Sequence, residues 1–86
     1  MYNIKLEKKV LKFLNKHKWE KIIDIFTTYL RILQKDPYNN RLDIQLLKWN
    51  KKQYRLRISK YRFIYEIIDK ELIITFTDWD SRWGIY

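Results

Sequence analysis

The chain lacks cysteine, and its 86 residues include only one proline and one glycine. Without cysteine, neither a disulfide framework nor a thiolate zinc site can form. No charged and then apolar signal peptide opens the chain, and no apolar run approaches the roughly 18 residues of a membrane-spanning helix. The sequence has neither metal-ligand spacing of acidic residues and histidine nor a glycine-rich phosphate loop. We therefore expect one cytoplasmic domain over residues 1–86, without a metal or a cofactor.

The charge of the chain is strongly one-sided. Nineteen Lys and Arg residues against 10 Asp and Glu residues give a net charge of +9. Repulsion among these charges destabilises a small domain, and such surfaces usually bind phosphate polymers, anionic membranes or acidic proteins. Four Trp and seven Tyr exceed what so small a core needs, and bases stack on aromatic rings. The composition favours RNA or single strands as the partner, although an AT-rich genome would enrich lysine, isoleucine, asparagine and tyrosine without any function.

Hydrophobic periodicity predicts an α+β fold. A short strand is expected at Tyr2–Lys5, a helix with apolar spacings of three and four at Leu6–His17, and a second helix at Trp19–Leu33 that Asp36 and Pro37 end. The period then changes to two, and further strands are expected at Leu42–Leu46, Tyr54–Ser59, Tyr61–Ile68 and Glu71–Thr77. This order, β-α-α-β-β-β-β, predicts a two-helix hairpin packed on one face of a mainly antiparallel four-to-five-stranded sheet.

Two tight turns predict the register of the last three strands. If Ser59-Lys60 and Asp69-Lys70 each form a two-residue hairpin, the cross-strand partners follow. One face of the sheet then carries only apolar and aromatic side chains: Tyr54, Leu56, Ile58, Tyr61, Phe63, Tyr65, Ile67, Leu72, Ile74 and Phe76. A shift by one residue would scatter this set over both faces, so the pattern specifies the register.

The opposite face of the predicted sheet brings three arginines together. It carries Arg55, Arg57, Arg62, Ile64, Glu66, Ile73, Thr75 and Thr77. Arg57 and Arg62 face each other across two strands, and a like-charged pair of this kind costs about 0.2–1 kcal/mol. Such a cluster favours an anionic ligand, and the alternative is a solvated face on which arginine stems cover apolar neighbours. The last segment starts nearby, so Arg82 and Tyr86 are placed to fold back over the cluster.

The central hairpin and the end of the chain resemble a known family. The run Tyr54–Glu66, YRLRISKYRFIYE, resembles the central hairpin of RelE-type toxins of the RelE/ParE family, and the ending SRWGIY resembles the closing Arg and Tyr of that family. The order of elements also agrees. Members that cut RNA often have Lys at the positions of Arg55 and Arg57, and Lys60 stands where Gly or Asp is usual. The resemblance implies a type II toxin–antitoxin toxin that inhibits translation as a ribosome-dependent mRNA endoribonuclease.

The resemblance also implies which residues act. It places the catalytic residues at Arg55, Arg57, Arg62, Arg82 and Tyr86. In such a reaction the 2′-OH attacks the adjacent phosphate, Arg57 and Arg62 neutralise the growing charge, and Tyr86 accepts the proton because arginine stays protonated. Glu66 is either the next candidate base or an ion-pair partner of an arginine. Further RNA contacts are expected at Lys48, Lys51, Lys52, Lys60, Trp79 and Trp83.

Two other functions remain open at this level. A ParE-like toxin would inhibit DNA gyrase without cutting anything, and a basic RNA-binding domain would have no catalytic role. The arginines with a terminal tyrosine favour the nuclease over the gyrase inhibitor, but they barely separate it from the RNA-binding domain. The partners expected are the ribosome, mRNA and a small acidic antitoxin that folds over the basic face, and neither a membrane nor a small-molecule cofactor.

Overall fold

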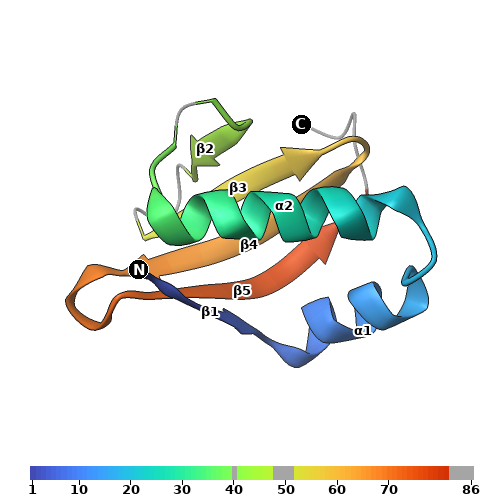
Figure 1. Cartoon of the computed structure of the whole chain (residues 1–86), viewed down its shortest axis with the longest axis horizontal. Coiled ribbons are helices and arrows are strands. Elements are labelled where there is room, and N and C mark those ends of the chain that lie inside the picture. Colours follow the sequence, from blue (N-terminus) through green and yellow to red (C-terminus); the bar gives the residue numbers. More distant parts are fainter. Residues whose placement is uncertain (40, 48–51, 82–86) are drawn as a thin grey trace.

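The computed structural model describes residues 1–39, 41–47 and 52–81. Its elements are β1 (Asn3–Leu6), α1 (Lys8–Lys16), α2 (Lys21–Lys35), β2 (Ile44–Leu46), β3 (Gln53–Ile58), β4 (Tyr61–Ile68), the short 3₁₀ turn η1 (Asp69–Glu71) and β5 (Ile73–Asp80). The five strands form one sheet in the order β1-β5-β4-β3-β2, in which only β1 and β5 run parallel (Figure 1). The α+β class and the order of elements are those predicted from the sequence.

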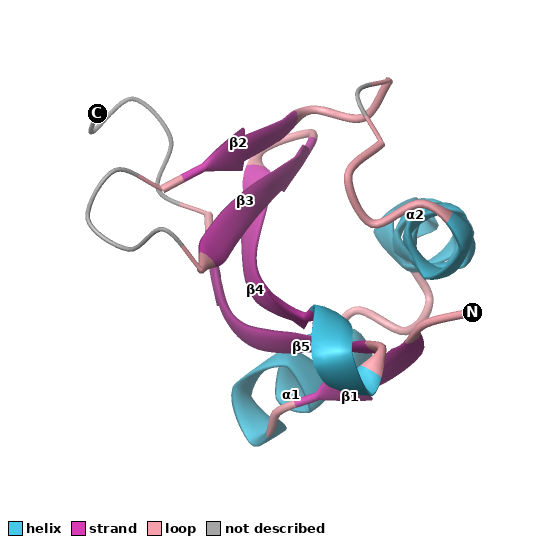
Figure 2. Ribbon diagram, turned by 90° about the vertical axis from the view of Figure 1, so that its left-hand side faces the viewer, coloured by secondary structure: helices cyan, strands magenta, loops and turns pink. Residues whose placement is uncertain are grey.

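Both helices pack on the apolar face of the sheet through the residues that their periodicity selects. The side chains that become buried are Val10 and Phe13 in α1 and Ile22, Phe26 and Leu33 in α2. Figure 1 shows α2 lying across the sheet, with α1 beside β1 and β5. In Figure 2 no helix lies over the other side of β3 and β4. Neither of the two described helices is long and apolar enough to cross a membrane.

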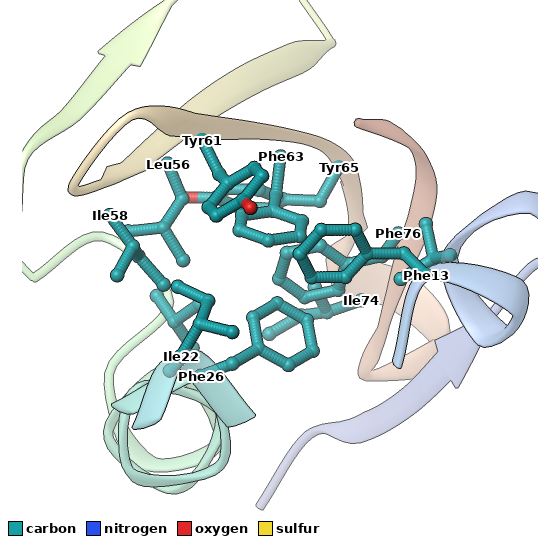
Figure 3. Packing of buried hydrophobic residues seen from close by; sticks show 12 residues of the cluster. Phe13, Ile22, Phe26, Leu56, Ile58, Tyr61, Phe63, Tyr65, Ile74 and Phe76 are labelled. Carbon is teal, nitrogen blue, oxygen red and sulfur yellow. The ribbon is translucent and has the colours of Figure 1, made fainter. Parts of the chain in front are cut away.

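Aromatic rings fill the space between the helices and the sheet. Phe13 of α1 and Phe26 of α2 each meet the ring of Phe63 on β4, at centroid distances of 5.3 Å and 4.6 Å (Figure 3). Phe26 also contacts Phe76 of β5 at 5.4 Å, edge to face. These four phenylalanines and Tyr65 are almost completely buried. Six of the twelve buried core residues in the described part of the chain are therefore aromatic, and such large rings bury much apolar area with few rotatable bonds.

The first predicted hairpin is confirmed and the second is wrong. In β3 and β4, Leu56 pairs with Phe63 and Arg57 with Arg62, as a turn through Ser59 and Lys60 requires. The β4–β5 connection is longer than predicted, because Asp69–Glu71 form a 3₁₀ turn and Leu72 follows with a φ of 54°.

The longer connection changes the β4–β5 register without changing the faces. Ile67 pairs with Ile74 instead of Leu72, and Leu72 is exposed in the turn. Because the register moves by an even number of residues, Ile74 and Phe76 still point into the core. Leu72 therefore has to be removed from the predicted core face, and the rest of that face stands.

A β-bulge interrupts the pairing of β4 with β5. Tyr65 pairs with Phe76, but its neighbour Ile64 pairs with Asp78, so Thr77 is the extra residue in β5. Beyond a bulge, the alternation of side chains is reset. Trp79 therefore points to the apolar side, where its ring lies 4.6 Å from that of Phe13. Asp78 and Asp80 turn to the opposite side of the sheet.

Candidate nucleic-acid interface

The arginine cluster consists of Arg55 and Arg57 on β3 and Arg62 on β4. Their register places them on the sheet face that points away from the core, as predicted. Arg57 and Arg62 are cross-strand partners next to the hairpin turn. Ser59 opens that turn with a φ of 56°, a conformation that tight hairpins need at their first turn position. The strand alternation and this one turn therefore suffice to bring the two guanidinium groups together.

The three arginines differ in their surroundings. Arg57 is exposed, and no ion pair joins it to another residue of the described ranges. The Arg55 side chain is 16% exposed, and its Nη2 donates hydrogen bonds to Gln45 Oε1 at 2.9 Å and Asp43 Oδ1 at 3.3 Å. The Arg62 side chain is 12% exposed, and its Nη2 lies 3.5 Å from Asp80 Oδ1. An anion on this face would reach Arg57 directly, whereas at Arg55 and Arg62 it would compete with a carboxylate.

Sequence reasoning missed the two aspartates of β5 as members of this face. The bulge brings Asp78 level with Ile64 and Asp80 level with Arg62. Asp78 also forms an ion pair with Lys9, which ties α1 to the edge of the arginine face. The sequence did hold a signal, because strict alternation after Phe76 would bury both aspartates and expose Trp79. That outcome costs the desolvation of two carboxylates, so a bulge is the physically favoured solution.

Glu66 lies away from the Arg57–Arg62 pair, although it is a diagonal neighbour of Arg55. It pairs with Gln53 at the open end of the β3–β4 hairpin, whereas Arg57 and Arg62 lie next to its turn. Gln53 Nε2 donates a hydrogen bond to Glu66 Oε1 at 3.2 Å. The ion pair with an arginine that the sequence suggested is not found among the described side chains.

The remaining predicted RNA contacts and catalytic residues do not form one group with the arginine cluster among the described residues. Lys52 is exposed, and Lys60 lies in the hairpin turn with its Nζ 5.4 Å from the centroid of the Tyr61 ring. Trp79 is half-buried on the apolar face, a position that the predicted register did not give it. The remaining predicted residues lie outside the described residues: Lys48, Lys51, Arg82, Trp83 and Tyr86. Within residues 1–39, 41–47 and 52–81, no group of three potential metal ligands occurs.

A second polar cluster lies at the other end of β4. The hydroxyl groups of Tyr2 and Tyr38 donate hydrogen bonds to the two carboxylate oxygens of Asp69, at 2.6 Å and 2.7 Å. These hydrogen bonds hold the pKa of Asp69 below its usual range and raise the pKa values of both tyrosines. The cluster joins the start of the chain, the segment after α2 and the β4–β5 turn, so its role is structural.

Replacing Asp69 with asparagine is expected to lower the melting temperature at neutral pH. A depressed carboxyl pKa contributes stability above the pKa of the unfolded chain, and this contribution is lost as the pH falls through the folded-state pKa. The difference between wild type and Asp69→Asn should therefore be constant near neutrality and shrink below about pH 4. Thermal melts from about pH 3 to about pH 8 test this. A difference that grows on acidification would contradict the assignment.

The class that these features define is an α+β domain with two helices on one face of a five-stranded sheet and an arginine cluster on the other. No family model matches the chain, and no curated protein matches it. Solved structures do. The archaeal RelE–RelB complex from Pyrococcus horikoshii OT3 contains a chain 26% identical, with a TM-score of 0.83, covering 96% of this chain and 97% of that one.

Bacterial structures extend the similarity. The isolated E. coli RelE toxin is 18% identical with a TM-score of 0.78, and the alignment covers 100% of this chain and 92% of the toxin. A RelBE-type toxin–antitoxin complex from Mycobacterium tuberculosis gives 20% identity, a TM-score of 0.72 and coverages of 94% and 98%. The protein is therefore RelE-like over nearly its whole length, which confirms the resemblance that its sequence shows.

Proposed function

We propose that the protein is the toxin of a type II toxin–antitoxin system and inhibits translation as a metal-independent, ribosome-dependent mRNA endoribonuclease. The observation that carries this proposal is the cross-strand pair of Arg57 and Arg62, on the sheet face that neither described helix covers in a RelE-like fold. A like-charged pair destabilises a hairpin, and although Asp80 lies 3.5 Å from Arg62, no carboxylate of the described residues forms an ion pair with Arg57. RNA phosphate would supply an anion for this pair.

The proposed reaction begins when the 2′-OH of the RNA attacks the adjacent phosphorus atom. A bond from the 2′ oxygen to phosphorus forms and the bond to the 5′ oxygen breaks, and the departing 5′ oxygen takes up a proton from water, which leaves a cyclic phosphate and a free 5′-OH. The forked guanidinium groups of Arg57 and Arg62 bind the phosphate oxygens while negative charge builds on them. Arg62 exchanges the Asp80 carboxylate for phosphate when RNA binds. Arg55, held by Gln45 and Asp43, extends the positive field along β3.

The proton of the 2′-OH needs an acceptor that arginine does not supply, since arginine stays protonated in proteins. We assign this role to Tyr86, and to Arg82 the stabilisation of the phenolate. Glu66 is a weaker candidate, because it lies at the far end of the hairpin and already accepts a hydrogen bond from Gln53. The ribosome would hold the 2′-OH in line with the scissile bond, and this positioning would lower the part of the activation barrier that the toxin itself has to overcome.

The proposed partners follow from the charge and from the similar structures. The structure from Mycobacterium tuberculosis is a toxin–antitoxin complex, and that from Pyrococcus horikoshii is a RelE–RelB complex. A net charge of +9 and an arginine face that neither described helix covers suit an acidic antitoxin segment that folds on binding. The antitoxin and the message would compete for the same arginines. Action on translating ribosomes places the protein in the cytoplasm.

Induction of the protein is expected to create new mRNA 5′ ends inside translated regions, at a fixed position within codons. Codon phasing arises because the ribosome presents the message in register. Deleting Tyr86 should slow cleavage by roughly 10²-fold or more, the usual contribution of a general base. Binding should change less, because phosphate contacts supply most of the affinity. Sequencing of RNA 5′ ends after induction measures cleavage, with co-expression of a cognate antitoxin as the suppressing control, and an RNA-binding assay of the purified variant measures affinity.

Three outcomes would decide against parts of this proposal. Broken DNA with intact messages would identify a gyrase inhibitor. A protein that binds RNA and leaves both growth and messages unchanged would be an RNA-binding domain without catalysis. Cleavage that persists after deletion of Tyr86 would retain the nuclease and remove Tyr86 as the proton acceptor.

A further inference from the structure

The turn between α1 and α2 exposes a tryptophan. The sequence placed Trp19 in the apolar stripe of the second helix, but α2 begins only at Lys21 and Trp19 is 90% exposed. The Nζ atom of Lys18 lies 5.6 Å from the centroid of the Trp19 ring. A chain with so small a core gains stability from every ring it buries, so a solvated indole contributes almost nothing to folding.

This turn lies against the hairpin that carries the arginine cluster. The ring of His17, at the end of α1, is 5.7 Å from the ring of Tyr61, and Arg62 directly follows Tyr61 on β4. The turn has a defined shape, because Glu20 Oε2 lies 2.7 Å from His17 Nδ1 and the Glu20 backbone N–H donates to the His17 carbonyl oxygen at 2.9 Å. In Figure 1 the turn and the β3–β4 hairpin lie at the same end of the molecule. Tyr61 points into the core and Arg62 points from the opposite face, so Trp19 lies at the same end of the sheet as Arg57 and Arg62 but on the helix side.

The charges around the turn are arranged for an anion. Lys8, Lys12 and Lys16 are exposed and follow one another at the four-residue spacing at which like charges repel on a helix. Lys16 lies in the last turn of α1, next to the α1–α2 turn. These repulsions lower the stability of α1 in isolation. A bound polyanion would offset them.

We propose that Trp19 and Lys18 form a stacking platform for one base of single-stranded RNA that passes around the tip of the β3–β4 hairpin from the phosphate site of the arginine cluster. The open face of the indole stacks on the base, and Lys18 stays close enough to attract the neighbouring phosphate. An acidic peptide would use the lysines and gain little from a planar ring, whereas a stacked base uses both. The inference rests on the proposed function only for the source of the RNA. In the proposed function, that RNA is the part of the message next to the cleavage position.

The test measures the affinity of the full chain for a 2′-O-methyl oligouridylate of about 12 nucleotides, by fluorescence anisotropy at several salt concentrations. The 2′-O-methyl group prevents cleavage, so binding is read separately from catalysis. Trp19→Ala should weaken binding about tenfold, and Trp19→Phe should retain most of the affinity. Lys18→Ala should weaken binding less and make its salt dependence shallower.

The chain offers a matched control at the other end of the sheet. Lys70 and the exposed Leu72 stand in the β4–β5 turn, so they too combine a lysine with an exposed apolar side chain. Lys70→Ala and Leu72→Ala should leave RNA affinity unchanged. Circular dichroism should show wild-type folding of Trp19→Ala, because its ring is solvated in the native state.

The outcomes separate this inference from the proposed function. Wild-type affinity in Trp19→Ala, together with weakened binding in Arg57→Ala, would refute the platform and leave the proposed function standing. An equal loss in Trp19→Phe and Trp19→Ala would also refute stacking. If neither the wild type nor any variant binds the oligonucleotide, and messages stay intact on induction, the proposed function fails as well.

Discussion

Replacement of Arg57 with alanine is expected to abolish growth inhibition while the fold and its stability remain. Arg57 is exposed, so its removal creates no cavity, and it relieves the repulsion with its cross-strand partner Arg62. Loss of one group that stabilises a developing negative charge typically costs about 10²–10³-fold in rate. Growth after induction measures the toxicity, and message cleavage measures the catalytic rate. A thermal melt of the purified variant measures its stability.

Two further variants sharpen this test. Arg57→Lys keeps the charge but loses the planar fork, so partial activity is expected. Arg31→Ala removes an exposed arginine from α2 and should leave toxicity unchanged. Full toxicity in Arg57→Ala would show that the pair does not neutralise the phosphate. Arg62→Ala is less suitable as the first test, because it leaves the Asp80 carboxylate without this guanidinium and so mixes stability with function.

Replacement of Phe13 with alanine is expected to cost about 3–5 kcal/mol of stability. The ring is almost completely buried and contacts the rings of Tyr61, Phe63 and Trp79, so truncation leaves a cavity at the meeting point of α1, β4 and β5. The total free energy of unfolding of a domain of this length is roughly 4–13 kcal/mol. The variant should therefore melt at least about 12 °C lower or fail to fold. Thermal and urea unfolding followed by circular dichroism measure the loss.

The matched control for Phe13 lies on the same helix. Leu11 is 51% exposed, and Leu11→Ala should change the free energy of unfolding by less than about 0.5 kcal/mol. Equal effects of the two substitutions would mean that α1 does not dock through Phe13. The contacts of Phe13 with Tyr61, Phe63 and Trp79 would then not stabilise the fold.

Local patterns of the sequence determined most of the architecture. The spacings in α1 and α2 select Val10, Phe13 and Phe26, which the structure buries. The alternation from Tyr54 to Ile67 specifies both faces of β3 and β4, because one turn at Ser59 and Lys60 links neighbouring strands and a slip by one residue would expose the apolar set. The face-to-face arrangement of Arg57 and Arg62 follows from this local arithmetic.

The tertiary structure decided what surrounds the arginines. The register of β5 depends on a longer connection and on the bulge at Thr77, and these arise because Trp79 gains burial against Phe13 while Asp78 and Asp80 stay out of the core. The strand alternation by itself carries no information about such a reset. The exposure of Trp19 beside the hairpin likewise depends on how α1 docks on the sheet. Periodicity assigns side chains to faces only within one strand or helix. Which charges of distant segments pair depends on the packing that buries the most apolar area without desolvating a carboxylate.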